Sequence, residues 1–182
     1  MLSRGNWLIL GLAVLAAALG GYAQHRSRPP ASTADAPPTL LGQPLPPLSL
    51  PDLDGASHRL DSYRGRRVLL NFWASWCAPC LREMPALAEA QAKFGEKAPI
   101  VVGIAMDEPA RIRAFLAAHP VNYPILIGRM GPPSTSLLLG NTRQVLPYSV
   151  LIDADGRLLA TQAGPLSATQ LAQWLAPAKD RH

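Results

Sequence analysis

The sequence predicts an α/β fold in which helices flank a central mixed sheet. Two apolar segments of strand length, residues 67–73 and 99–105, are each followed by a stretch with helical periodicity. This alternation is typical of a parallel sheet core. Nearer the C-terminus, Asp155-Gly156 separates two more strand-like segments and predicts a hairpin. The hairpin adds antiparallel pairing, so the expected sheet is mixed.

The expected elements follow one another from residue 48 onward. Residues 48–60 turn at Asp54-Gly55 and predict a small β-hairpin. Pro109 suits the first turn of a helix, and Ser167 is the expected N-cap of the last one. The other expected strands are 67–73, 99–105, 123–127, 148–153 and 157–161, and the expected helices are 81–94, 109–119, 134–139 and 167–175. This order is the layout of a thioredoxin-like domain, residues 48–176, with an N-terminal hairpin and a central insertion.

The N-terminal residues 1–23 carry an uncharged apolar segment from Trp7 to Ala23. It is either a cleaved signal peptide or a signal anchor that stays as a transmembrane helix. Its length favours the anchor, whereas Arg26 and Arg28 behind it weigh against one, because positive charge prefers the cytoplasmic side. No cysteine stands directly behind the segment, which excludes a lipoprotein anchor. Both interpretations place the domain outside the cytoplasmic membrane, facing the periplasm or the exterior.

A proline-rich stretch, residues 24–47, is the predicted linker, and residues 177–182 form a predicted tail. The formal net charge of +5 is spread along the chain. A nucleic-acid-binding protein gathers its basic residues on one face, so this pattern does not indicate nucleic-acid binding.

Both cysteines of the chain lie in Trp76-Cys77-Ala78-Pro79-Cys80, where a buried strand is expected to give way to a helix. Cys77 falls at the helix N-terminus, where free backbone N–H groups carry a partial positive charge. They stabilise a thiolate and make Cys77 a nucleophile near neutral pH. Cys80, one turn further on, is placed to attack a mixed disulfide formed at Cys77.

Two structural roles compete with a redox role for this pair. A zinc site needs four ligands, and the chain has no second cysteine pair and only scattered histidines. A purely structural disulfide that closes so short a loop would stabilise little. The pattern favours a redox couple, and it predicts no metal and no other cofactor.

Residues 70–85, LNFWASWCAPCLREMP, closely resemble the TlpA/ResA family of membrane-anchored thiol–disulfide oxidoreductases. Residues 145–153, VLPYSVLID, are similar to the second signature of that family. The resemblance covers approximately residues 42–176. It implies a thioredoxin fold, an extracytoplasmic location and reduction of disulfides in partner proteins, often in cytochrome c maturation. Re-reduction by a transmembrane electron carrier of the DsbD type is expected.

Glu83 lies three residues after Cys80 on the same face of the expected helix. The resemblance implies that Glu83 handles protons for the cysteine pair. A half-buried carboxylate there would have a raised pKa, which suits acid–base work. The alternative is a surface carboxylate that favours the start of the helix. Asn71 stands where thioredoxin carries a buried aspartate, so more of the proton handling is expected of Glu83. The candidate catalytic residues are therefore Cys77, Cys80 and Glu83.

Pro147 matches the cis-proline that the family places opposite its cysteines. A cis bond exposes the backbone of the preceding residue, Leu146, for strand-like pairing with a substrate peptide. The alternative is an ordinary trans proline at the start of an edge strand. Many relatives have threonines where this chain has Tyr148-Ser149, which leaves the substrate contacts open. The candidate substrate-binding residues are Leu146, Pro147 and Trp76, whereas Trp73 is expected to pack in the core.

Three other functions share parts of this pattern. A thiol oxidant can carry the same motif, because the difference lies in how strongly the thiolate is stabilised. A peroxiredoxin-like peroxide reductase would have threonine three residues before its reactive cysteine, where this chain has Ala74. A copper-delivery module would need further soft ligands. The expected function is a membrane-tethered reductase of protein disulfides.

Overall fold

The computed structural model describes residues 40–94 and 99–176, which belong to one compact unit beginning at Leu40. The apolar segment 1–23, residues 24–39 of the predicted linker and the tail 177–182 lie outside the described residues. Within the described ranges, no helix is both long enough and apolar enough to cross a bilayer.

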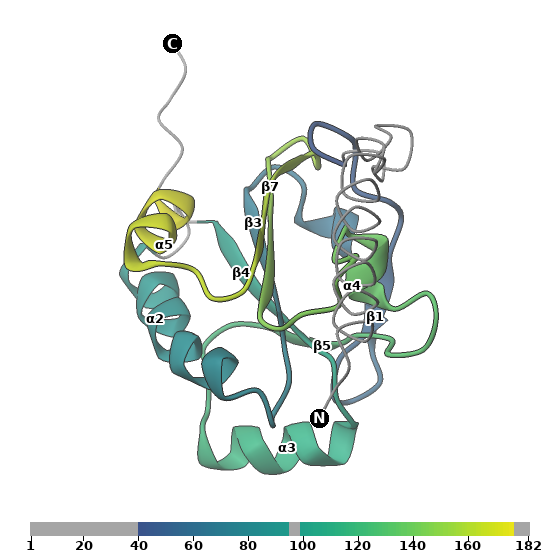
Figure 1. Ribbon diagram of the computed structural model, residues 1–182, viewed down its shortest axis with the longest axis vertical. Helices are drawn as coiled ribbons and strands as arrows, with labels where there is room; N and C mark the ends of the chain where they lie inside the picture. The colour runs from purple at the N-terminus through teal and green to yellow at the C-terminus, as the bar shows by residue number, and fades with distance from the viewer. Residues whose placement is uncertain (1–39, 95–98, 177–182) are drawn as a thin grey trace, which may run out of the picture. The chain divides into compact units, whose positions relative to one another are not determined.

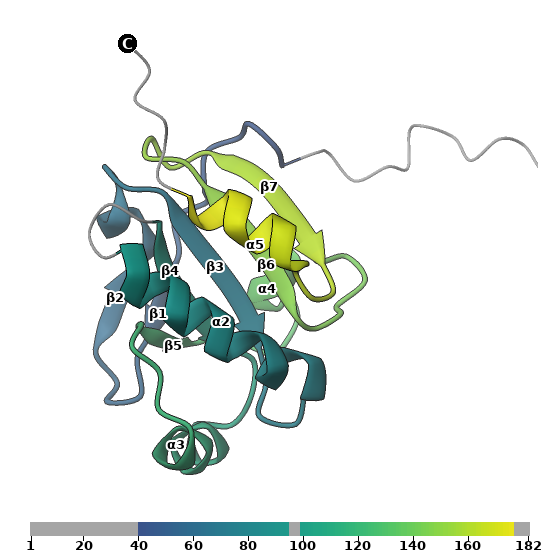
Figure 2. The ribbon, with the colours of Figure 1, turned by 90° about the vertical axis from the view of Figure 1, so that its left-hand side faces the viewer.

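A five-stranded mixed sheet forms the centre of the domain (Figure 1), and its strand order is β5-β4-β3-β6-β7 (Figure 2). Its strands are β3 (Val68–Trp73), β4 (Ile100–Ala105), β5 (Ile125–Ile127), β6 (Tyr148–Ile152) and β7 (Leu158–Ala163). Strands β3, β4 and β5 run parallel, and β6 and β7 add antiparallel pairing. The predicted mixed sheet, with a C-terminal hairpin, is confirmed.

Helices cover both faces of this sheet. They are α2 (Ala78–Phe94), α3 (Pro109–Ala118), α4 (Thr135–Leu138) and α5 (Ala168–Leu175). Figure 2 shows α2 and α5 lying across one face, and Figure 1 shows α4 and the N-terminal hairpin on the other. The α/β class with helices flanking the sheet is therefore confirmed.

The predicted N-terminal hairpin consists of β1 (Ser49–Pro51) and β2 (Ser57–Arg59), which pair antiparallel. A short 3-10 helix, η2 (Leu60–Tyr63), follows directly and was not predicted. An isolated bridge between Asp52 and Leu126 joins the hairpin to the sheet edge at β5.

The C-terminal end of the predicted linker is packed on the domain rather than extended away from it. The backbone N–H of Gly42 donates to the Leu158 carbonyl, and that of Leu45 donates to Gly156, each at 2.7 Å. Leu40 and Leu45 also pack against the main core cluster. Proline content marked these residues as linker, but two leucines and free backbone groups let them pair with the β6–β7 hairpin.

Strand β3 supplies the middle of the core, and all six of its residues are buried. Leu70 and Phe72 pack with Leu139 on one side of the sheet. Leu69 packs with Leu87 of α2 on the other side. Because side chains alternate along a strand, Asn71 shares the face of Leu69 and therefore lies toward α2.

The ends of the helices refine the expectations. Helix α2 begins at Ala78 rather than at residue 81 and continues past Pro85. Pro109 opens α3 as expected. Ser167 caps α5 and forms a reciprocal capping box with Gln170.

Candidate functional site

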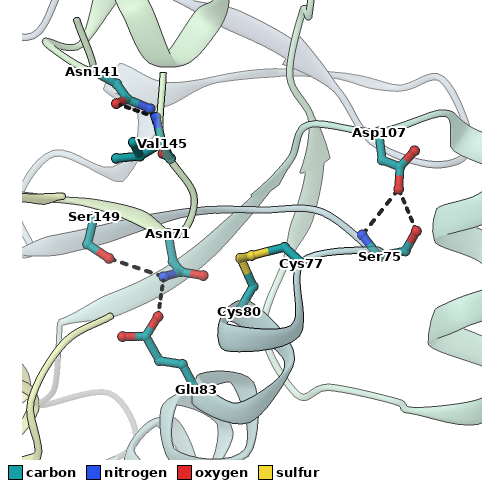
Figure 3. Close-up of a disulfide and its surroundings, with 9 residues drawn as sticks. All are labelled: Asn71, Ser75, Cys77, Cys80, Glu83, Asp107, Asn141, Val145 and Ser149. Carbon is teal, nitrogen blue, oxygen red and sulfur yellow. Dashed lines mark hydrogen bonds between the residues drawn. A yellow bond between two sulfur atoms is a disulfide. The ribbon is translucent and has the colours of Figure 1, made fainter. Parts of the chain in front are cut away.

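The two cysteines lie where the central strand passes into α2, and they form a disulfide (Figure 3). Their Cα atoms are 5.3 Å apart. Cys77 immediately precedes the first residue of α2, and its carbonyl accepts the backbone N–H of Leu81 at 3.1 Å. Cys77 thus stands at the helix N-terminus and Cys80 in the first turn, as predicted. Amide groups that point out of this end favour a thiolate at Cys77 once the disulfide is reduced.

The two cysteines are buried, but Trp76, the residue before Cys77, is exposed. Cys77 retains 4% of its accessible surface and Cys80 none, whereas Trp76 is 66% exposed. A large exposed aromatic residue beside a buried reactive group offers apolar contact area to an incoming partner. Trp73 is buried and stacks at a tilt against Phe115, in agreement with its expected packing role.

Asp107 fixes the loop that leads into Cys77. It lies two residues after the end of β4, is 4% exposed, and accepts hydrogen bonds from the backbone N–H of Ser75 at 3.1 Å and the Ser75 hydroxyl at 2.5 Å. The backbone N–H of Glu108 donates to it at 2.8 Å. Burial works to raise the pKa of Asp107, but these hydrogen bonds outweigh it and hold the pKa below its usual value.

Glu83 is buried beneath the disulfide, on the face of α2 that meets the sheet (Figure 3). Its Oε2 accepts from Asn71 Nδ2 at 3.1 Å, and its Oε1 accepts from the backbone N–H of Leu166 at 2.8 Å. Burial raises the pKa of Glu83, and the two hydrogen bonds offset part of that rise. The carboxylate is therefore not on the surface, and its pKa shifts in the direction expected from the sequence.

Asn71 connects Glu83 to strand β6. Its Nδ2 also donates to Ser149 Oγ at 3.1 Å, and both side chains are buried. Asn71 and Ser149 are directly paired in the β3–β6 register, so their side chains lie on the same face of the sheet. The position where thioredoxin has an aspartate is thus filled by an amide whose Nδ2 donates hydrogen bonds to both Glu83 and Ser149.

The loop before β6 lies next to the cysteines. The Leu146–Pro147 peptide bond is cis, which confirms the expected cis-proline. Leu146 packs against the cluster that contains both cysteines. Asn141 fastens this loop, because its side chain donates to the Val145 carbonyl at 2.9 Å and accepts from the Val145 N–H at 3.1 Å.

Comparison with known proteins matches this arrangement to a family. Residues 41–161 match the family model described as the AhpC/TSA family. The chain is 32% identical over 136 residues to the thiol-disulfide oxidoreductase ResA of Geobacillus thermodenitrificans (strain NG80-2), which covers 74% of this chain and 76% of that protein. The chain belongs to the AhpC/TSA family and is a thiol–disulfide oxidoreductase of the TlpA/ResA type.

Solved structures of similar proteins have the same thioredoxin-like fold. A thiol:disulfide interchange protein DsbE from Chlorobium tepidum superposes with a TM-score of 0.63 at 30% identity, over 73% of this chain and 92% of that one. The exposed lipoprotein thioredoxin Etrx1 of Streptococcus pneumoniae strain TIGR4 gives a TM-score of 0.59 at 27% identity, over 70% and 96%.

Sequence reasoning named the two cysteines that form the disulfide of this TlpA/ResA-type protein but missed two residues that hold the surroundings of the pair. Asp107 was detectable in principle, because an acidic residue two positions after a buried strand lies at the sheet edge where β3 also ends. Asn141 gave no such signal, since its partner is the backbone of a loop. Among the described residues, no group of three or more His, Cys, Asp or Glu side chains is arranged to hold a metal ion.

Proposed function

We propose that this TlpA/ResA-type protein reduces disulfide bonds in partner proteins outside the cytoplasmic membrane. The observation that carries the proposal is the Cys77–Cys80 disulfide at the start of α2, with buried Glu83 on one side and the Leu146–Pro147 loop on the other. In the reduced protein, the Cys77 thiolate attacks a substrate disulfide, and one substrate sulfur leaves as a thiolate that takes up a proton. Cys80 then loses its proton and attacks Cys77, which releases the second substrate sulfur and forms the Cys77–Cys80 disulfide. Two electrons pass to the substrate in each cycle.

Glu83 is the proposed proton acceptor for Cys80 in this cycle. A carboxylate with a raised pKa holds or releases a proton nearer to neutral pH than an ordinary one, which is what proton transfer with a thiol requires. Its position one turn after Cys80 on α2 supports this role.

The proposed substrate contacts are Trp76, Leu146 and Pro147. The exposed indole of Trp76 supplies apolar surface, and the backbone of Leu146 is proposed to pair with an extended substrate segment. Tyr148 does not take part in these contacts, because it is buried and its hydroxyl donates to the Leu139 carbonyl at 2.9 Å.

The proposed location is the outer face of the cytoplasmic membrane, with residues 1–23 as a single-pass anchor. The apolar N-terminal segment supports this location, as does the similarity to a pneumococcal protein described as an exposed lipoprotein. A transmembrane carrier of the DsbD type is the proposed electron donor, and cytochrome c maturation is the proposed pathway of its substrates.

Trapping tests the proposed reaction. In a Cys80→Ser variant the resolving thiol is absent, so mixed disulfides at Cys77 should persist and accumulate with periplasmic proteins. The matched Cys77→Ser variant should trap far fewer partners. Its remaining thiol, Cys80, is fully buried and lies within the first turn of α2 rather than at the helix N-terminus. Equal trapping by both variants would contradict the assigned roles. A measured reduction potential as high as that of a strong thiol oxidant would contradict the proposed direction of electron flow and indicate that the protein oxidises its partners.

A peroxide reductase is the second candidate, because the matching family model also carries the AhpC/TSA description. A peroxidatic cysteine would need a polar hydroxyl residue three positions earlier, where this chain has the fully buried Ala74. Stopped-flow mixing of the reduced protein with hydrogen peroxide should therefore show only the slow oxidation of an ordinary thiolate. Rapid peroxide consumption would favour the second candidate.

A further inference from the structure

We propose that Asn71 and Ser149 are positioning residues that hold Glu83 and adjust to the gain or loss of its proton. This inference rests on the proposed function, in which Glu83 exchanges a proton with Cys80. It adds two residues from different strands to the proton-handling apparatus.

The geometry places one amide between two groups. Asn71 Nδ2 donates one hydrogen to Glu83 Oε2 and the other to Ser149 Oγ, each at 3.1 Å. All three side chains are buried, and Ser149 has no accessible surface. Water therefore does not compensate a change at Glu83, and the neighbouring side chains must do so.

The chemistry of the two partners suits both protonation states of Glu83. An amide has two N–H donors on one side and an oxygen with two lone pairs on the other, and a serine hydroxyl both donates and accepts. Toward the carboxylate, Asn71 presents Nδ2. Toward the protonated acid, a half-turn of the amide presents Oδ1, which accepts from the Glu83 hydroxyl and from the rotated Ser149 hydroxyl. In both states the Asn71 amide keeps a hydrogen bond to Glu83.

Other groups that face Glu83 do not take over this role. The backbone N–H of Leu166 donates to Oε1 and stays a donor at every pH. Tyr123 lies before β5, and burial together with the charge of Glu83 raises its pKa, so its phenol stays neutral. On α2 itself, the neighbouring titratable groups are the thiols of the reduced cysteine pair.

The test measures the protonation of Glu83 directly. The side-chain carboxyl carbon of Glu83 is followed by NMR against pH in the full chain labelled with 13C-glutamate, and Glu83→Gln identifies its signal. Asn71→Leu removes the donor to the Glu83 carboxylate. It should raise the midpoint of the Glu83 titration by about one pH unit, because a hydrogen bond to a charged group is lost. Ser149→Ala should raise the midpoint less, because the amide remains but is no longer oriented. The control is Ser136→Ala, a buried serine of α4, which should leave the midpoint unchanged.

A second readout separates positioning from general damage to the fold. The rate at which Cys77 of the reduced protein is alkylated is measured against pH. Glu83→Gln should abolish the step in this pH profile that depends on the Glu83 proton, and Asn71→Leu should shift that step along the pH axis. When Glu83→Gln is already present, adding Asn71→Leu should leave the profile unchanged. Equal shifts in both backgrounds, or a Glu83 midpoint unmoved by Ser149→Ala, would overturn the inference. The midpoint does not depend on exchange activity, so a wild-type protein that fails to reduce disulfides would contradict the proposed function alone.

Discussion

Two carboxylates flank the disulfide, and their pKa values shift in opposite directions (Figure 3). Both are almost inaccessible to solvent. Glu83 accepts two hydrogen bonds, from Asn71 and Leu166, and desolvation dominates. Asp107 accepts three, from Ser75 and Glu108, and the hydrogen bonds dominate. The first therefore suits proton exchange, whereas the second stays charged and serves as a fixed acceptor.

Asp107→Asn should destabilise the protein in a pH-dependent way. The pKa of Asp107 is lower in the folded than in the unfolded state, so its contribution is present above its unfolded pKa and is lost as the pH falls through the folded one. We expect a loss of about 2 kcal/mol in the free energy of unfolding at pH 7, shrinking in strong acid. Denaturant unfolding at both pH values measures this loss.

The matched control for Asp107→Asn is Asp155→Asn in the exposed β6–β7 turn. Asn-Gly fits such a turn as well as Asp-Gly, so little change in stability is expected. A loss at Asp107 that is equally large at low pH would show that packing, rather than charge, is responsible.

At the scale of elements, the start of α5 is hydrogen-bonded to a residue of the candidate site. The residue before the cap, Leu166, donates its backbone N–H to Glu83, and α5 packs against α2. The Ser167–Gln170 capping box sets where α5 begins and hence where this N–H points.

Ser167→Ala should cost about 1 kcal/mol of stability, because the Ser167 hydroxyl no longer accepts the backbone N–H of Gln170. Thermal unfolding measures the loss, and Thr169→Ala in the exposed first turn of the same helix is the control. If both variants unfold at the same temperature, the cap does not contribute as argued.

At the scale of the whole molecule, the described domain extends further toward the N-terminus than the strands alone require. Residues 42–45 pair with the β6–β7 hairpin, which closes one end of the core. Residues 42–45 therefore belong to the folded domain.

Leu45→Ala should lower the stability of the full chain by about 1 kcal/mol, since a partly buried leucine loses its core contacts. Leu41→Ala lies four residues earlier in the same segment, where the side chain is 48% exposed, and should have little effect. Denaturant titrations of both variants give the comparison. Equal stability of the two would mean that the segment is not part of the folded unit.

The sequence alone determined the order of the strands and α-helices, the mixed sheet and the place of the cysteine pair. Each depends on local signals: apolar runs for β3 and β4, Asp155-Gly156 for the hairpin, and two cysteines at a strand-to-helix junction. Only the tertiary structure decided that Asp107 holds the loop before that pair and that Asn71 and Ser149 lie beside Glu83. Asp107 reaches Ser75 across 32 positions of the chain, and Asn71 reaches Ser149 across 78. Such contacts are set by strand register and by burial, and these arise only when distant segments pack together.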